Sequence, residues 1–209
     1  MALKPGDYDF LSNMSAIWSI VIGALLATVG GLVGSQLERR LEMSRRQHDS
    51  ALLFAEILST LKILFDIAAD SRKTGDPYGP ITLRMLRSAR REIDIYERNR
   101  ENLLDLRDGE LRAKIHTTIL RLTMPLEGIF DSCQALDALA VQLKTTNLSE
   151  RDRKEIEARM TSIRDNREAG FGFMMETAQT QLRDAVAELA AYGGGPSGEM
   201  INRVVGQST

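Results

Sequence analysis

The stretch that decides the class of this molecule is residues 14–33, which read MSAIWSIVIGALLATVGGLV. No charged residue occurs between Phe10 and Leu37, and a densely charged segment begins at Glu38. An α-helix needs about 20 apolar residues to cross the hydrocarbon core of a bilayer. The stretch therefore predicts an N-terminal transmembrane helix, to which we give the bounds 14–35.

Two other interpretations of this stretch stay open. A secretory signal peptide needs a basic start, a shorter apolar core and small residues at its cleavage site. Here Lys4 is balanced by Asp7 and Asp9, although cleavage after Gly30 or Ser35 is sterically conceivable. A buried core helix is the other alternative, but core helices rarely run so far without a charge.

Basic residues flank the stretch unequally. Lys4 precedes it, whereas four arginines follow within a dozen residues. Because basic residues are retained on the cytoplasmic side, we expect residues 1–13 outside and residues 36–209 in the cytoplasm. The protein would then be a single-pass protein of the inner (cytoplasmic) membrane. The residues expected to set this topology are Arg39, Arg40, Arg45 and Arg46.

Small residues recur every four positions in the predicted transmembrane helix. Side chains four apart share one face of a helix, and in lipid a face without bulk lets two helix backbones approach closely. We therefore expect a homo-oligomer formed through this helix, with the lipid bilayer around it. The alternative is the ordinary glycine content of a membrane helix. The residues assigned to the self-association face are Ser19, Gly23, Ala27, Gly31 and Ser35.

The remaining chain has the composition of a helical protein. Aromatic residues make up 5% and charged residues 27% of the sequence, and no run of alternating β-branched residues is bounded by turns. The sequence predicts an all-α fold, in which the transmembrane helix continues into a stalk and an antiparallel cytoplasmic helical bundle follows. The expected segments are a basic stalk at 36–50, a bundle domain at 51–192 and a disordered tail at 193–209.

Four helical blocks are expected after the membrane. Apolar residues at spacings of three and four favour helices, and glycine and proline between residues 75 and 80 end the first block. Pro125 should kink or restart the third helix. The expected helices are 36–70, a second from near Thr82 with Arg87, Arg90 and Arg91 on its polar side, a third with Asp108 as N-cap, and a fourth opened by Ser149 and Asp152 in a variant of the capping box.

Residues 93–115 read IDIYERNRENLLDLRDGELRAKI. This segment, with the preceding span and arginine-rich stalk, resembles uncharacterised bacterial single-pass membrane proteins that have a helical cytoplasmic domain. The resemblance implies an architecture and no activity. The chain departs from it at Asn102 and at His116–Thr117. We expect Tyr96, Leu103 and Leu104 to fill the junction between two helices.

Catalytic and metal-binding patterns are absent from the sequence. The chain has two histidines, His48 and His116, and one cysteine, Cys133, too few and too far apart for a zinc site. No phosphate-binding loop, nucleophile elbow or dinucleotide fingerprint occurs. We expect a non-enzymatic protein with no catalytic residue, cofactor or metal. Residues 36–209 carry a formal charge of −1, which argues against a nucleic-acid partner.

Three functions remain compatible with the sequence. The first is a membrane-anchored interaction or scaffold protein that presents its helical domain to an unknown cytoplasmic protein. The second is a phage- or prophage-type membrane effector, holin-like or an exclusion protein, that acts through oligomerisation of the span. The third is a ligand-sensing helical domain, whose pocket would need convergent polar groups such as Thr117, Thr118 and Thr123.

Overall fold

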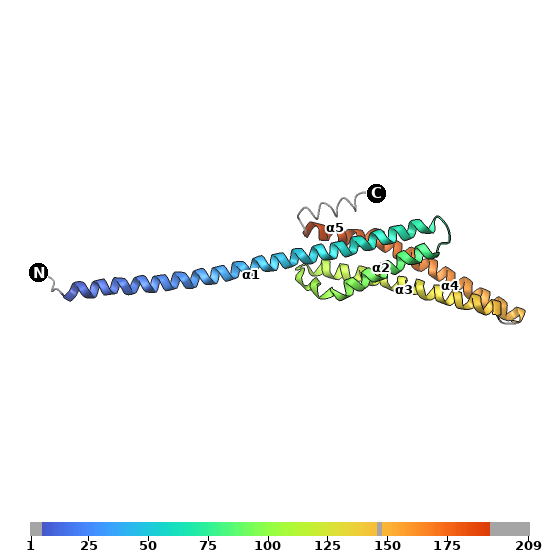
Figure 1. Ribbon diagram of the computed structural model, residues 1–209, viewed down its shortest axis with the longest axis horizontal. Helices are drawn as coiled ribbons and strands as arrows, with labels where there is room; N and C mark the ends of the chain where they lie inside the picture. The colour runs from blue at the N-terminus through green and yellow to red at the C-terminus, as the bar shows by residue number, and fades with distance from the viewer. Residues whose placement is uncertain (1–5, 146–147, 193–209) are drawn as a thin grey trace. The chain divides into compact units, whose positions relative to one another are not determined.

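The structure is a computed structural model that describes the backbone of residues 6–145 and 148–192, and the side chains of residues 22–144 and 148–192. The described residues form helices and no strand (Figure 1). The all-α, helical-bundle prediction is therefore confirmed. The disordered tail expected at 193–209 lies outside the described residues. The elements are α1 (Gly6–Arg72), α2 (Pro80–Arg98), the 3₁₀ helix η1 (Arg100–Asp105), α3 (Gly109–Thr145), α4 (Glu150–Thr177), the π-helical segment η2 (Ala178–Leu182) and α5 (Arg183–Tyr192).

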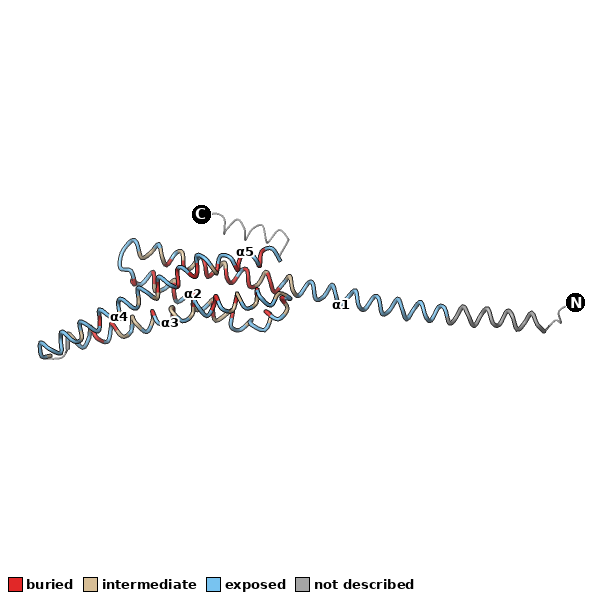
Figure 2. Tube along the Cα trace, turned by 180° about the vertical axis from the view of Figure 1, so that it is seen from behind, coloured by how far each residue is buried: buried red, intermediate tan, exposed pale blue. Residues whose placement is uncertain are grey.

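The chain divides into two compact units, residues 1–46 and 47–209. Within the first unit every described side chain, from residue 22 to residue 46, is exposed (Figure 2). No helix among the described residues has a stretch long and apolar enough to cross a membrane. The transmembrane helix expected at 14–35 is therefore unsupported by the described side chains. The side chains of residues 14–21 are not among those that the structure describes. The described apolar stretch ends at Leu37, just before the charged segment that begins at Glu38.

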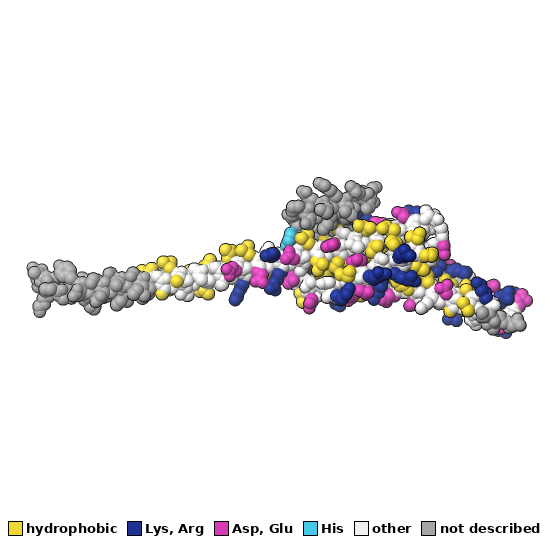
Figure 3. Space-filling view, in the orientation of Figure 1, with side chains coloured by type: hydrophobic (Ala, Val, Ile, Leu, Met, Phe, Trp, Pro, Cys, Tyr) yellow, Lys and Arg dark blue, Asp and Glu magenta, His cyan; other side chains and the backbone are white. Residues whose placement is uncertain are grey.

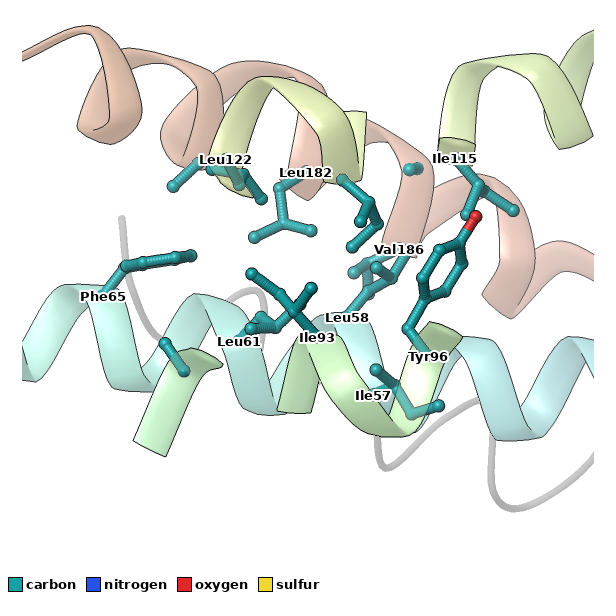
Figure 4. Packing of buried hydrophobic residues seen from close by; sticks show 14 of the residues in the cluster. Ile57, Leu58, Leu61, Phe65, Ile93, Tyr96, Ile115, Leu122, Leu182 and Val186 are labelled. Atoms are coloured by element: carbon teal, nitrogen blue, oxygen red, sulfur yellow. The ribbon is translucent and has the colours of Figure 1, made fainter. Parts of the chain in front are cut away.

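In the second unit, α1, α2, α3 and α4 run alternately in opposite directions, and η2 and α5 continue in the direction of α4 (Figure 1). Its core is formed by buried apolar side chains of α1, α2, α3, α4, η2 and α5. Burying these side chains is the main stabilising contribution to the fold. Figure 4 shows part of this core. The largest fully buried side chains include Phe54, Leu58, Leu61 and Phe65 of α1, Leu86, Ile93 and Tyr96 of α2, and Ile115, Ile119 and Leu122 of α3.

Local signals start the helices where the sequence predicts. The Asp108 carboxylate accepts hydrogen bonds from the backbone N–H groups of Glu110 (2.9 Å) and Leu111 (3.1 Å), which makes it the expected N-cap of α3. Ser149 caps α4 by accepting from the Asp152 N–H at 3.2 Å. The Ser149 hydroxyl also donates to the Asp152 carboxylate at 2.7 Å. A hydrogen bond between side chains therefore completes this variant of the capping box.

Two local features of the later helices differ from what the sequence predicts. Helix α3 continues through Pro125, so the proline does not restart it. A Cβ added to Gly170 of α4 would lie 3.8 Å from the Pro125 Cβ, which shows how closely α3 and α4 approach here. The last helical block is divided by the π-helical segment Ala178–Leu182, which the apolar spacing did not predict.

The junction between α2 and α3 corrects one expectation. Tyr96 is fully buried and Leu103 is 5% exposed, as expected. Leu104, however, is 77% exposed, and Leu106 is the fully buried residue in its place. The 3₁₀ turn η1 causes the change, because side chains three apart eclipse one another and so Leu103 and Leu106 share a face.

Helices α3 and α4 extend past the other helices as a two-helix arm (Figures 1 and 2). This arm has its own small apolar cluster, formed by Leu136, Leu139 and Met160 and separate from the main core. Partly buried residues complete it, because two helices cannot enclose their apolar faces as a full bundle does. These residues are Ala140, Leu143, Ile156 and Ile163.

Candidate functional site

Two arginines and two aromatic rings stack where the turn after α1 meets α4. The guanidinium carbon of Arg72 lies 3.8 Å from the centre of the Phe171 ring and 4.8 Å from that of Tyr78. The guanidinium carbon of Arg167 lies 3.6 Å from the centre of the Tyr78 ring. The two rings meet edge to face, with centres 6.3 Å apart. Cation–π contacts of this kind stabilise by about 0.5–2 kcal/mol each.

Polar contacts hold this stack in place. Arg72 donates to the Glu168 carboxylate at 2.5 Å, and the Tyr78 hydroxyl donates to the Arg167 carbonyl at 3.4 Å. Burial raises the pKa of Tyr78 to about 12, although the nearby Arg72 charge opposes the rise. The Nε atoms of Arg72 and Arg167 are buried without a hydrogen-bond partner among the described residues. The stack therefore joins the α1–α2 turn to α4.

A groove of about 500 Å³, which Tyr78 helps to line, lies along the first turns of α2. We call it the arginine groove, because three of its lining residues are arginines. Lys and Arg side chains gather over α2 on this face of the molecule (Figure 3). Its lining residues are Asp76, Tyr78, Gly79, Pro80, Leu83, Arg84, Arg87 and Arg91.

The turn that opens the groove is tight. Gly79 donates its backbone N–H to the Asp76 carbonyl at 2.9 Å, and a Cβ on Gly79 would lie 3.2 Å from that oxygen. Glycine therefore permits the turn, and Pro80 begins α2, where its missing N–H costs nothing. Gly79 supplies no side-chain cap and the first turn of α2 has no acidic residue. The positive end of the helix dipole is thus not compensated by a side chain there.

The arginines of α2 differ in their partners, and Arg98 at its end donates to the Asp94 backbone carbonyl at 3.2 Å. Arg90 forms ion pairs with Asp94 (3.1 Å) and with Glu127 of α3 (3.2 Å). Arg84, Arg87 and Arg91 are exposed, and no ion pair joins them to a described carboxylate. At spacings of three and four, these three cations repel one another along one helix face.

A second polar cluster surrounds His116. Its Nδ1 lies 3.3 Å from the Tyr96 hydroxyl and its Nε2 lies 3.3 Å from an Arg100 nitrogen. Arginine only donates, so a neutral His116 ring accepts at Nε2 and carries its proton on Nδ1, facing the tyrosine oxygen. Burial raises the pKa of Tyr96 to about 12, with the Arg100 charge opposing it. Both ring nitrogens are thus occupied by structural contacts.

The residues expected to mediate self-association are described only in part. The side chain of Ser19 lies outside the described residues. Gly23 and Gly31 have no atom within 4 Å of an added Cβ, and Ala27 and Ser35 are exposed. Whether a second copy covers this face therefore stays a prediction.

The arginines expected to set topology are all exposed. Arg39, Arg40 and Arg45 lie on the charged part of α1 after the apolar stretch, and Arg46 pairs with Glu42 at 2.6 Å. Such an exposed pair contributes little to stability.

The remaining candidate residues do not converge on one site. Among residues with described side chains, no group of three or more His, Cys, Asp or Glu could hold a metal ion. Cys133 is partly buried and accepts from Arg167 at 3.5 Å. Of the three threonines, Thr117 is exposed, and Thr118 and Thr123 donate to carbonyls of their own helix.

Sequence reasoning missed the arginine groove. It placed Arg87 and Arg91 on a solvated face together with Arg90, because the spacing alone could not show which of them meets a carboxylate. The available signal was the recurrence of Arg84, Arg87 and Arg91 beside a Gly–Pro turn. Comparison with protein-family models, curated proteins and solved structures found no match to this chain.

Proposed function

We propose that this chain is a membrane-anchored, non-enzymatic interaction protein. One observation carries the proposal: large apolar side chains in the described part of the N-terminal stretch are all more than half exposed. Burying each of them in lipid would contribute about 1.5–3 kcal/mol, so a bilayer is the environment that suits this segment. These residues are Ile22, Leu25, Leu26, Val29, Leu32 and Val33.

The distribution of side-chain size around the helix supports an anchor that also self-associates. At 100° per residue, Ile22, Leu26 and Val29 fall on one face. Ala27 and Gly31 fall about 140° and 180° from Ile22, toward the opposite face, and Gly23 lies at the border, about 100° from Ile22. Large side chains suit lipid and small ones suit a second helix, so the proposed oligomer uses the face that lacks bulk.

The proposed orientation places the bundle in the cytoplasm. Arg39, Arg40, Arg45 and Arg46 follow the apolar stretch directly, and their exposure is consistent with contact to the cytoplasmic membrane surface. The bundle would then meet a cytoplasmic protein. The α3–α4 arm supports an interaction role, because its separate cluster is only partly covered by the chain itself.

Membrane attachment is tested with the full-length chain. We expect the wild-type protein to resist extraction by sodium carbonate and to dissolve in detergent. Leu25→Arg combined with Val29→Arg should release it into the carbonate-soluble fraction, because a charge at the centre of a span costs about 2.5–3.5 kcal/mol per residue. Leu41→Arg is the matched control, since Leu41 is an equally exposed leucine of α1 beyond the apolar stretch. Release of the wild-type protein by carbonate would contradict the anchor.

A further inference from the structure

The arginine groove has more positive charge than its surroundings neutralise. Arg84, Arg87 and Arg91 all line it, and no described carboxylate lies within ion-pair distance of any of them. The one acidic residue that lines the groove is Asp76, whose carboxylate accepts the Tyr78 backbone N–H at 3.0 Å. That carboxylate therefore serves the turn and not the arginines.

The contrast with Arg90 argues against an ordinary solvated charge run. Arg90 lies between Arg87 and Arg91 in sequence and forms ion pairs with two carboxylates, one from its own helix and one from α3. Arg98, the other α2 arginine outside the groove, donates to the Asp94 backbone carbonyl at 3.2 Å. Both α2 arginines outside the groove thus have a hydrogen-bond partner among the described residues, whereas no such partner is seen for the three that line it. Three cations at this spacing destabilise the helix unless an anion lies among them.

The size of the groove fits a small ligand. Its volume of about 500 Å³ falls within the usual range for ligand sites. Leu83 and the buried Tyr78 give it an apolar wall, which keeps water from one side of the charges and strengthens their attraction for an anion. Arg84 and Arg91 are seven residues apart, about 10 Å along the helix axis. One carboxylate cannot reach both, whereas several linked anionic groups can.

We propose that the arginine groove binds a ligand that carries two or more phosphate groups. Guanidinium groups form two parallel hydrogen bonds with carboxylates and phosphates alike. A phosphate monoester favours the groove more strongly because it carries about −1.5 to −2 charge and three strong acceptor oxygens. Such a ligand is either a free oligophosphate or the phosphorylated headgroup of a lipid. The inference is independent of the proposed membrane anchor, because the groove lies wholly within residues 76–91.

The experiment uses the full-length chain in detergent and isothermal titration calorimetry. The probes are inorganic tripolyphosphate, a water-soluble short-chain phosphatidylinositol bisphosphate, and a glutamate peptide of the same charge. We expect saturable binding of a phosphate probe. Tighter binding of tripolyphosphate would assign a free oligophosphate, and tighter binding of the lipid would assign a headgroup. Equal binding of the glutamate peptide would overturn the proposal, because the groove would then select charge and not phosphate.

Matched variants locate the binding. Arg87→Gln with Arg91→Gln should lower the affinity by about tenfold or more, since two charge-assisted contacts are lost. Arg151→Gln with Arg153→Gln removes the same charge from exposed positions of α4 in the arm and should leave the affinity within about twofold. Helical circular dichroism and melting temperature confirm that each variant is folded. Equal losses in both pairs, or no saturable binding by the wild-type chain, would overturn the proposal.

Discussion

The guanidinium carbon of Arg72, at the end of α1, lies 3.8 Å above the centre of the Phe171 ring of α4. The same arginine pairs with Glu168, one helical turn before Phe171. The flat face of the Arg72 guanidinium thus contacts an aromatic ring, and its edge contacts a carboxylate, both on α4. This contact closes the end of the bundle where the α1–α2 turn crosses α4, and Tyr78 completes it from the other side.

Phe171→Ala should therefore destabilise the bundle strongly. Phe171 is 5% exposed, and removing a buried phenylalanine side chain costs about 3–5 kcal/mol in the free energy of unfolding. Phe173→Ala, two residues along the same helix, is the control: Phe173 is 45% exposed, so its loss should cost about 1 kcal/mol or less. Urea unfolding followed by circular dichroism measures both. Similar losses in the two variants would show that the stack does not stabilise the bundle.

The stability of the bundle should fall at high pH. The pKa values of Tyr78 and Tyr96 are raised to about 12 by burial, above the value of about 10 for an exposed tyrosine. Between pH 10 and pH 12 the unfolded chain has lost these protons and the folded chain retains them, so the free energy of unfolding decreases with rising pH. Below about pH 10 the two states bind these protons equally, and no such dependence is expected.

Absorbance of tyrosinate near 295 nm checks this expectation directly. In a pH titration of this absorbance, Tyr96→Phe should remove part of the rise near pH 12 and leave the rise near pH 10 unchanged. If the variant instead loses part of the absorbance rise near pH 10, Tyr96 is not shielded from water in solution. Urea unfolding of the same variant should show a smaller decline in stability above pH 10 than the wild-type chain.

Self-association through the small-residue face is tested by adding bulk. Gly23→Ile and Ala27→Ile should each weaken association in a membrane reporter assay by about 1 kcal/mol or more, because two backbones could no longer approach closely. A Cβ added at Gly23 meets no described atom within 4 Å other than its own helix backbone, so a loss would report on contact between copies. Val21→Ile and Leu25→Ile, off the face, should change little. Equal association of all four variants would contradict the predicted interface.

Topology is tested by a reporter enzyme that is active only outside the membrane, fused after Thr209. We expect the fusion to be silent, because the proposed orientation, set by the arginines from Arg39 to Arg46, places the following chain in the cytoplasm. A fusion before residue 14 should be active if its reporter is small enough to be translocated. Strong activity of the C-terminal fusion would reverse the proposed orientation.

The sequence by itself determined what depends on neighbours along the chain. Asp108 and Ser149 begin helices because each carboxylate or hydroxyl reaches an N–H two or three residues on. The Gly79–Pro80 pair begins α2 for an equally local reason, since glycine permits the tight turn and proline suits the first position of a helix. Apolar spacing likewise predicted an all-α bundle and most of its buried face.

The tertiary structure decided which of several similar residues are buried, paired or open. Leu104 and Leu106 are both leucines of one short segment, yet only Leu106 is buried, because the 3₁₀ turn aligns it with Leu103. Arg90 and Arg91 are adjacent, yet only Arg90 meets Glu127, which approaches from a helix about 35 residues away. The arginine groove and the stack on Tyr78 arise in the same way. Their geometry depends on which helices pack together, and spacing along one helix does not contain that information.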